Sequence, residues 1–93
     1  MSGTEEIHID PHTLIRAEER GTDEGEIRDV LATGFWIPAK YGRMGKAKVY
    51  AFGRTRGGKS YPHRRVEVYY QEEGGRIVTV TVYVFYGRWE QEP

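Results

Sequence analysis

The sequence predicts a single α+β domain in which two N-terminal helices pack on one face of a four-stranded antiparallel sheet. The chain has 93 residues, which suits one hydrophobic core. Helical signals end near Gly34, and beyond it apolar and polar residues alternate with the period of a strand. Helices and strands that are segregated along the chain are typical of the α+β class. We expect residues 1–93 to form one domain with a folded core over about 7–89.

Two short helices are predicted in the first third of the chain. Asp10 and Pro11 form a typical N-cap and first helical residue, and Gly21 suits the end of that helix. Thr22 can cap a second helix that ends at Gly34. The two helices should form a short hairpin. The inward-facing residues of the second helix should be Ile27, Val30 and Leu31.

Four strands should follow. The runs FWIP and KVYAF lie between glycines and are typical of short strands, and alternation resumes at Val66. After the turn at 72–75, a longer strand should run from Arg76 to about Tyr86. Its four valines should face the helices. The residues expected on the opposite, open face are Thr79, Thr81, Tyr83 and Phe85.

Basic side chains are concentrated in the middle of the chain. The net charge is zero, yet residues 35–65 contain nine basic and no acidic residues, while residues 1–34 carry a net charge of −6. Such a basic stripe indicates a phosphate-bearing partner. It also fits a solvated surface that pairs with the acidic first third, or a surface that binds an acidic protein. The basic stripe consists of Lys40, Arg43, Lys46, Lys48, Arg54, Arg56, Lys59, Arg64 and Arg65.

Residues 53–60 match the letters G-x-x-x-x-G-K-[ST] of a phosphate-binding loop. That loop works at the N-terminus of a following helix, whereas the segment 61–65 leads into a predicted strand. We therefore expect a flexible basic hairpin loop and no nucleotide cofactor.

His12 is the candidate general base. The first turn of a helix favours the neutral imidazole, and Arg16 lies one turn later on the same helical face. Because His8 lies outside the helix, the histidine pair does not predict a metal site, and we expect no cofactor. Alternatively, His12 only caps the helix or packs on the sheet edge. The hydroxyls of Thr79, Thr81 and Tyr83 belong either to a site or to an ordinary solvated sheet face. Tyr69 and Glu67 should lie beside them on the neighbouring strand.

The order of short motifs resembles that of a small bacterial family of unknown function. The likeness rests on HxxxRxxERG at 12–21, PAKYGR at 38–43, VEVY at 66–69 and IVTV at 77–80, and it covers roughly residues 8–86. That family resembles the RelE/ParE-type and BrnT-type toxins. These are small α+β proteins that are related in fold to microbial ribonucleases, with two N-terminal helices on an antiparallel sheet.

The resemblance implies a toxin-like, metal-independent endoribonuclease that an antitoxin protein holds in check. A base removes the 2′-hydroxyl proton, cations stabilise the phosphorane, and an acid protonates the leaving 5′ oxygen. The other seven residues of the basic stripe would contact the RNA. The residues implied in catalysis are His12, Arg16, Lys40, Arg43, Thr79 and Tyr83.

Two other functions stay open at this point. A non-catalytic module of the same fold could hold RNA or an acidic protein segment with the basic stripe and Tyr41, Tyr50 and Tyr61. Alternatively, a sheet edge could pair with a partner or a second copy. The absence of cysteine favours the cytoplasm. No apolar run reaches the length of a membrane span, and the acidic start MSGTEEIHID lacks a signal-like core.

Overall fold

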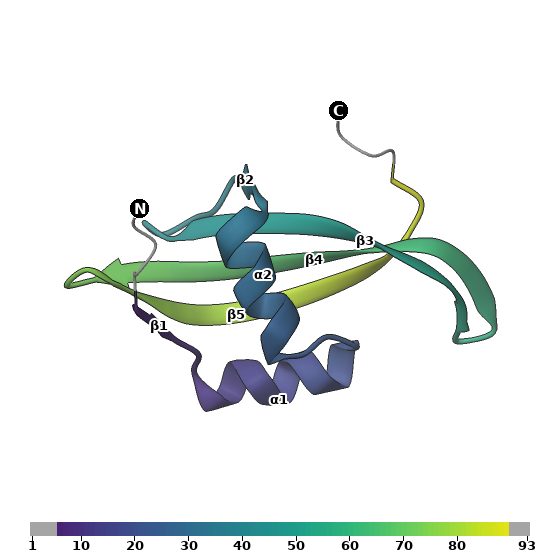
Figure 1. The fold of residues 1–93 in the computed structure, drawn as a ribbon, viewed down its shortest axis with the longest axis horizontal. Coiled ribbons are helices and arrows are strands. Elements are labelled where there is room, and N and C mark those ends of the chain that lie inside the picture. The colour runs from purple at the N-terminus through teal and green to yellow at the C-terminus, as the bar shows by residue number, and fades with distance from the viewer. Residues whose placement is uncertain (1–5, 90–93) are drawn as a thin grey trace.

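The computed structural model describes residues 6–89, which form two helices and a five-stranded mixed sheet (Figure 1). The strand order is β1-β5-β4-β3-β2. Residues 1–5 and 90–93 of the predicted domain, and with them the first half of the acidic start MSGTEEIHID, lie outside the described residues. The elements are β1 (Glu6–His8), α1 (Pro11–Arg20), α2 (Glu24–Thr33), β2 (Phe35–Ile37), β3 (Met44–Arg56), β4 (Lys59–Glu73) and β5 (Arg76–Gly87).

The sheet has one strand more than predicted. β1 pairs with β5 in parallel, with Ile7 opposite Ile77, whereas the other neighbouring strands are antiparallel. The α+β class is therefore confirmed, but the prediction of four antiparallel strands is wrong. A strand of three residues is too short to show the alternation on which strand prediction rests.

Both predicted helices are confirmed, with one shifted cap. The Asp10 side chain accepts a hydrogen bond of 3.0 Å from the His12 N–H, and Gly21 closes α1 with a φ of 93°. α2 begins after Asp23, whose carboxylate accepts a backbone N–H three residues later. Thr22, the predicted cap, is buried and donates its hydroxyl hydrogen to a carboxylate of α2 instead.

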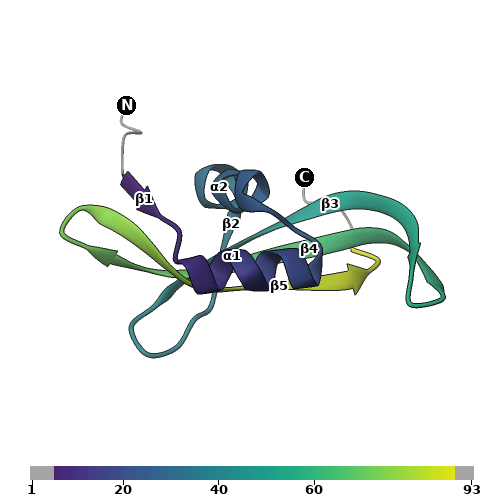
Figure 2. The same ribbon diagram turned by 90° about the horizontal axis from the view of Figure 1, so that it is seen from below.

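The helices cover one face of the sheet, but they do not form the predicted hairpin. α2 crosses β3 and β4, while α1 lies along β5 (Figure 1). Figure 2 shows α2 on one side of the sheet and no helix on the other, which we call the open face. Between α2 and the sheet lies the core, where full burial of each apolar side chain contributes roughly 1.5–3 kcal/mol. Its fully buried members include Ile27, Val30, Val66, Val68 and Val82.

A β-bulge in β5 divides the predicted valine face. Thr79 and Thr81 pair with successive residues of β4, which leaves Val80 without an opposite residue. Side chains after the bulge therefore exchange faces with those before it. Val82 joins the core, and Thr79 is only 4% exposed and donates a hydrogen bond of 3.2 Å to Thr13. The predictions that all four valines face the helices and that Thr79 lies on the open face are wrong.

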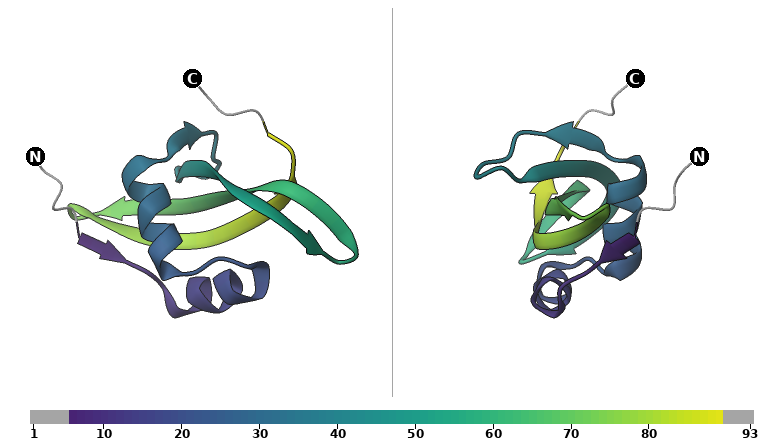
Figure 3. Two further views of the ribbon diagram at one scale, coloured as in Figure 1. Left: turned by 45° about the vertical axis from the view of Figure 1, so that its right-hand side comes forward. Right: turned by 90° about the vertical axis from the view of Figure 1, so that its left-hand side faces the viewer.

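The ends of β3 and β4 project from the body as a two-stranded hairpin (Figure 3). β5 ends opposite His63, so within residues 6–89 no third strand pairs with the hairpin beyond that residue. Gly57 and Gly58 form its turn with φ values of 61° and 82°, and a two-residue turn of this type needs positive φ at both positions. Residues 53–60 thus form a basic hairpin and not a phosphate-binding loop.

Candidate functional site

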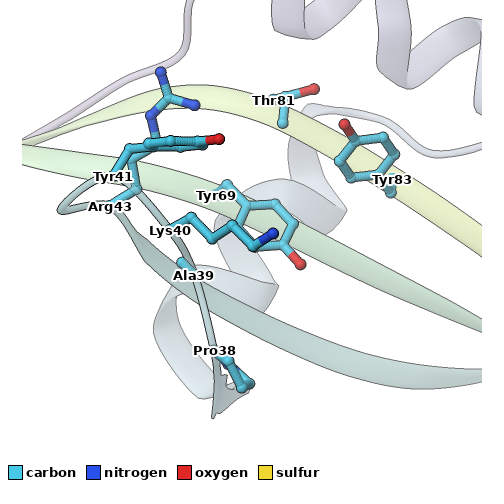
Figure 4. Close-up of a pocket in the computed structure, with 8 residues that line it drawn as sticks. All are labelled: Pro38, Ala39, Lys40, Tyr41, Arg43, Tyr69, Thr81 and Tyr83. Atoms are coloured by element: carbon cyan, nitrogen blue, oxygen red, sulfur yellow. The ribbon is translucent and has the colours of Figure 1, made fainter.

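A shallow pocket of about 280 Å³ lies on the open face, beside the loop that joins β2 to β3. The loop, residues 38–43, leaves the sheet on the side away from α2 and forms one wall (Figures 2 and 4). The floor consists of Tyr69 from β4 and of Thr81 and Tyr83 from β5. Small-molecule pockets usually hold roughly 300–1,000 Å³, so this open pocket suits one group of an extended ligand.

Local backbone geometry shapes both the floor and the wall of the pocket. The Tyr69 ring packs directly on Gly45, where a Cβ atom would lie 3.0 Å from that ring. In the loop, Tyr41 has a φ of 62°, a conformation that non-glycine residues rarely adopt, and it is followed by Gly42 with a φ of 70°. Tyr41 is 82% exposed, and the Arg43 guanidinium lies 5.8 Å from its ring centroid. The loop therefore presents an aromatic ring and a cation to solvent at the mouth of the pocket.

The hydroxyl of Tyr69 is held by a carboxylate. It donates a hydrogen bond of 2.9 Å to Glu67 Oε1, and Glu67 Oε2 accepts one of 2.9 Å from Arg65 Nε. Burial and the hydrogen bond to Glu67 raise the pKa of Tyr69 above its usual value. This hydroxyl is therefore protonated at neutral pH, and its one hydrogen must leave Glu67 before it is donated to a ligand.

Exposed aromatic rings continue the pocket along β5. The Tyr83 ring lies edge-on to that of Tyr69 at 5.9 Å and is stacked with that of Phe85 at 6.2 Å. Tyr83 and Phe85 are 40% and 46% exposed. Arg20, at the end of α1, donates a hydrogen bond of 2.7 Å to the Val82 carbonyl and lies 5.0 Å from the Tyr83 ring centroid. Exposed rings beside cations are the elements of surfaces that bind single-stranded nucleic acids.

The structure brings together three of the six residues implied in catalysis. Lys40, Arg43 and Tyr83 line the pocket, whereas His12, Arg16 and Thr79 do not. His12 and Arg16 are exposed on α1, and Arg16 pairs with Glu19 on the same helix at 3.4 Å. Thr79 is buried beneath α1 because the bulge turns it to that side.

Strand alternation divides the basic stripe between the two faces of the sheet. Lys46, Lys48 and Arg64 lie on the helix side. Lys46 Nζ donates to a backbone carbonyl near the end of α2 at 2.9 Å, and Lys48 Nζ lies 2.7 Å from Asp29 Oδ2. Arg64 forms a two-point ion pair with Glu26, with 2.7 Å between Nη1 and Oε1. For Lys48 and Arg64, pairing with carboxylates of the acidic first third is confirmed, whereas Lys46 binds a backbone carbonyl there.

The other residues of the basic stripe form fewer ion pairs with carboxylates. Arg65 pairs with Glu67, and Arg56 donates to the Glu19 carbonyl at 3.4 Å. Among residues 6–89, no carboxylate forms an ion pair with the other four cations of the stripe. These four are Lys40, Arg43, Arg54 and Lys59.

Sequence reasoning missed Arg20 and did not assign Tyr69 and Thr81 to the site. In the sequence, Arg20 is an ordinary cation in the last turn of a helix, where it complements the helix dipole. Tyr69 and Thr81 were expected beside Tyr83 on the open face, from alternation and the pairing of the last two strands, and the structure adds that all three line one pocket. No sequence signal shows that Arg20 reaches the open face.

The chain matches no family model, no curated protein and no solved structure. The resemblance to RelE-type toxins therefore stays a prediction. Within residues 6–89, no group of three or more His, Cys, Asp or Glu side chains is placed to hold a metal ion. Neither helix described there is long and apolar enough to cross a membrane.

Proposed function

We propose that the protein binds RNA through the open face of its sheet. The observation that carries this proposal is a pocket that unites Lys40 and Arg43, which form no ion pair with a carboxylate of residues 6–89, with the exposed rings of Tyr41 and Tyr83. Cations bind the phosphates of RNA, and unstacked bases pack on aromatic rings. An extended ligand fits better than a small molecule because the exposed ring of Phe85, stacked with that of Tyr83, continues the aromatic surface beyond the pocket.

The distribution of carboxylates supports the same proposal. Glu26 and Asp29 of the acidic first third are tied to Arg64 and Lys48 on the helix side of the sheet. These two carboxylates therefore do not oppose the approach of an anion to Lys40 on the open face. Without this separation, the net charge of zero would give RNA no electrostatic attraction to the protein.

The first test measures retention of a labelled, structured RNA at low salt in EDTA. The double variant Lys40→Ala/Arg43→Ala should lose affinity roughly tenfold. The slope of log K against the logarithm of the salt concentration should become less steep by about 1.4. The matched control, Arg28→Ala/Lys48→Ala, removes two cations from the helix side and should keep its affinity. An equal loss in both variants would show a response to net charge alone and would overturn the proposed surface.

A second test addresses base stacking. Tyr83→Leu should weaken binding by about 1–3 kcal/mol if a base stacks on this ring, whereas Tyr83→Phe should bind as the wild type does. Competition with an acidic peptide tests the alternative partner. If the peptide displaces the RNA, and if its affinity for Tyr83→Leu equals its affinity for the wild type, an acidic protein is favoured as the partner.

Metal-independent cleavage of RNA in the same pocket is a second candidate function. It is supported by the protonated Tyr69 hydroxyl in a pocket that also holds Lys40 and Arg43. The two cations would stabilise the phosphorane, and a tyrosine would protonate the 5′ oxygen as its bond to phosphorus breaks. Glu67 would take the 2′-hydroxyl proton while O2′ attacks the phosphorus, because Glu67 accepts the hydrogen bond of the pocket residue Tyr69, whereas His12 is exposed on α1.

The cleavage assay separates the two candidate bases. RNA incubated with the wild type in EDTA should yield 2′,3′-cyclic phosphate ends. Glu67→Gln and Tyr69→Phe should slow the reaction by about 10²-fold or more, and His12→Ala should not change it. Loss of cleavage in His12→Ala alone would support the base implied by the sequence. Retention of RNA without cleavage by the wild type would leave RNA binding as the function.

A further inference from the structure

We propose that the RNA-binding surface continues from the pocket, past the C-terminal end of α1 beside β5, to the projecting β3–β4 hairpin, whose cations bind a second set of phosphates. This inference rests on the proposed RNA binding. It specifies the ligand as a single strand of RNA that contacts two sites. The phosphates bind at both ends of the surface, and the bases bind between them.

A chain of contacts links the open face to the hairpin. Arg20 lies over the Tyr83 ring on the open face, and the Arg20 backbone carbonyl accepts a hydrogen bond of 2.7 Å from the Tyr86 hydroxyl. The guanidinium of Arg56, from the hairpin, lies 4.7 Å from the Tyr86 ring centroid. Cations and rings thus alternate from Tyr83 to Arg56, which is the pattern that a single strand with alternating phosphates and bases requires.

The hairpin itself concentrates positive charge. Arg56 lies directly opposite Lys59, and Arg54, two residues before Arg56, shares the same face of the two-stranded ribbon. Like charges opposite each other destabilise a strand pair, and a bound phosphate would relieve this repulsion. Residues 53–60 are all exposed, and none of them is acidic. The hairpin is therefore a favourable place for an anionic backbone.

The overall shape allows one strand to reach both ends. In Figure 2, the β2–β3 loop and the tip of the β3–β4 hairpin both bend toward the side away from α2, at opposite ends of the sheet. The molecule is 43 Å long along its longest axis. Single domains that bind single strands typically cover roughly 4–16 nucleotides. A strand near the upper part of that range would contact the pocket and the hairpin together, whereas a very short one would not.

The test compares oligouridylates of two lengths, with 2′-O-methyl groups so that no cleavage can occur. Wild-type protein should bind a 12-mer much more tightly than a 4-mer. Arg54→Ala/Lys59→Ala should bind the 12-mer roughly tenfold more weakly than the wild type does. For the 12-mer, the slope of log K against the logarithm of the salt concentration should become less steep by about 1.4. The affinity of this variant for the 4-mer should equal that of the wild type. The control Arg28→Ala/Arg76→Ala removes two cations elsewhere and should bind both oligonucleotides as the wild type does.

The outcomes separate this inference from the proposed function. If the hairpin variant binds the 12-mer as tightly as the wild type, the bipartite surface is wrong and RNA binding by the open face stands. If the hairpin variant and the control weaken equally, the effect is one of net charge and the inference is also overturned. If wild-type protein binds neither oligonucleotide nor structured RNA, the proposed function itself fails. Circular dichroism melting of each variant establishes that it is folded.

Discussion

The two sides of the sheet use the same residue types in opposite ways. On the helix side, Lys48 and Arg64 are bound by carboxylates of α2, and the Tyr50 hydroxyl donates to Asp29 at 2.6 Å. On the open face, Lys40 and Arg43 stand beside tyrosines without a carboxylate ion-pair partner among the described residues. Lys48 and Arg64 therefore contribute to stability, whereas Lys40 and Arg43 are free to bind a ligand.

This difference shows why a run of charge in the sequence is ambiguous. Neighbouring residues of a strand point to opposite faces, so a basic stripe along β3 and β4 is shared between both sides of the sheet. The helices then decide which cations are neutralised. Arg64 and Arg65 are adjacent in the chain, yet one pairs with Glu26 of α2 and the other with Glu67 of the open face.

Removal of the helix-side ion pair should have the largest effect on stability. Glu26→Ala leaves Arg64, whose side chain is only 15% exposed, without its carboxylate. The free energy of unfolding should fall by about 2–3 kcal/mol, measured by urea denaturation. RNA affinity of the folded variant should not change. A loss of RNA affinity without a loss of stability would contradict the division between the faces.

An added methyl group under the pocket should have an effect of similar size on the other face. Gly45→Ala places a Cβ 2.9 Å from Ile37 and 3.0 Å from the Tyr69 ring, which must move. We expect a loss of about 1–3 kcal/mol in stability together with weaker RNA binding. The control Gly25→Ala, in α2, should stabilise the protein by about 0.5–1 kcal/mol. An unchanged melting temperature and unchanged binding in Gly45→Ala would refute the packing described for the floor.

Acid should weaken the helix-side network selectively. Burial acts to raise the pKa of Glu26, but hydrogen bonds from Arg64 and Thr22 outweigh it and lower that pKa below its ordinary 4.5. Hydrogen bonds from Lys48 and Tyr50 lower the pKa of Asp29 below 3.8. A carboxylate with a lowered pKa contributes stability above its unfolded-state pKa, and that stability is lost as the pH falls through the folded-state value.

The measurement is the urea midpoint followed from about pH 6 down to about pH 3. Wild-type stability should decline below the ordinary Glu26 value of 4.5, and Glu26→Gln should show a shallower decline from a lower starting stability. Parallel pH curves for the two proteins would argue that this ion pair does not control the acid response.

The smallest effect on stability is expected at the open-face cation. Lys40 lies in an exposed loop and forms no ion pair with a described carboxylate, so Lys40→Ala should change the free energy of unfolding by less than about 0.5 kcal/mol. Thermal melting is the appropriate measurement. A clear destabilisation would mean that Lys40 has a structural role like that of Lys48, and the comparison between the faces would fail at this residue.

Local signals in the sequence determined the helices and turns of this protein. Asp10 and Gly21 delimit α1 because capping depends on groups within a few residues of the helix end. Gly57 and Gly58 form a tight turn because that turn needs two residues with positive φ. The apolar spacing in α2 likewise predicted that Ile27 and Val30 would be buried, and both have no exposed surface.

Only the tertiary structure decided which side chains meet. One unpaired residue, Val80, reverses the face of the residues beyond it, so alternation counted along β5 places Thr79 on the wrong side. The parallel strand β1 is three residues long and forms because β5 offers an edge with which it can pair. Arg20 reaches Tyr83 because α1 lies along β5. These relations join residues that are distant in the chain, and they depend on register and packing, which the local periods and caps do not encode.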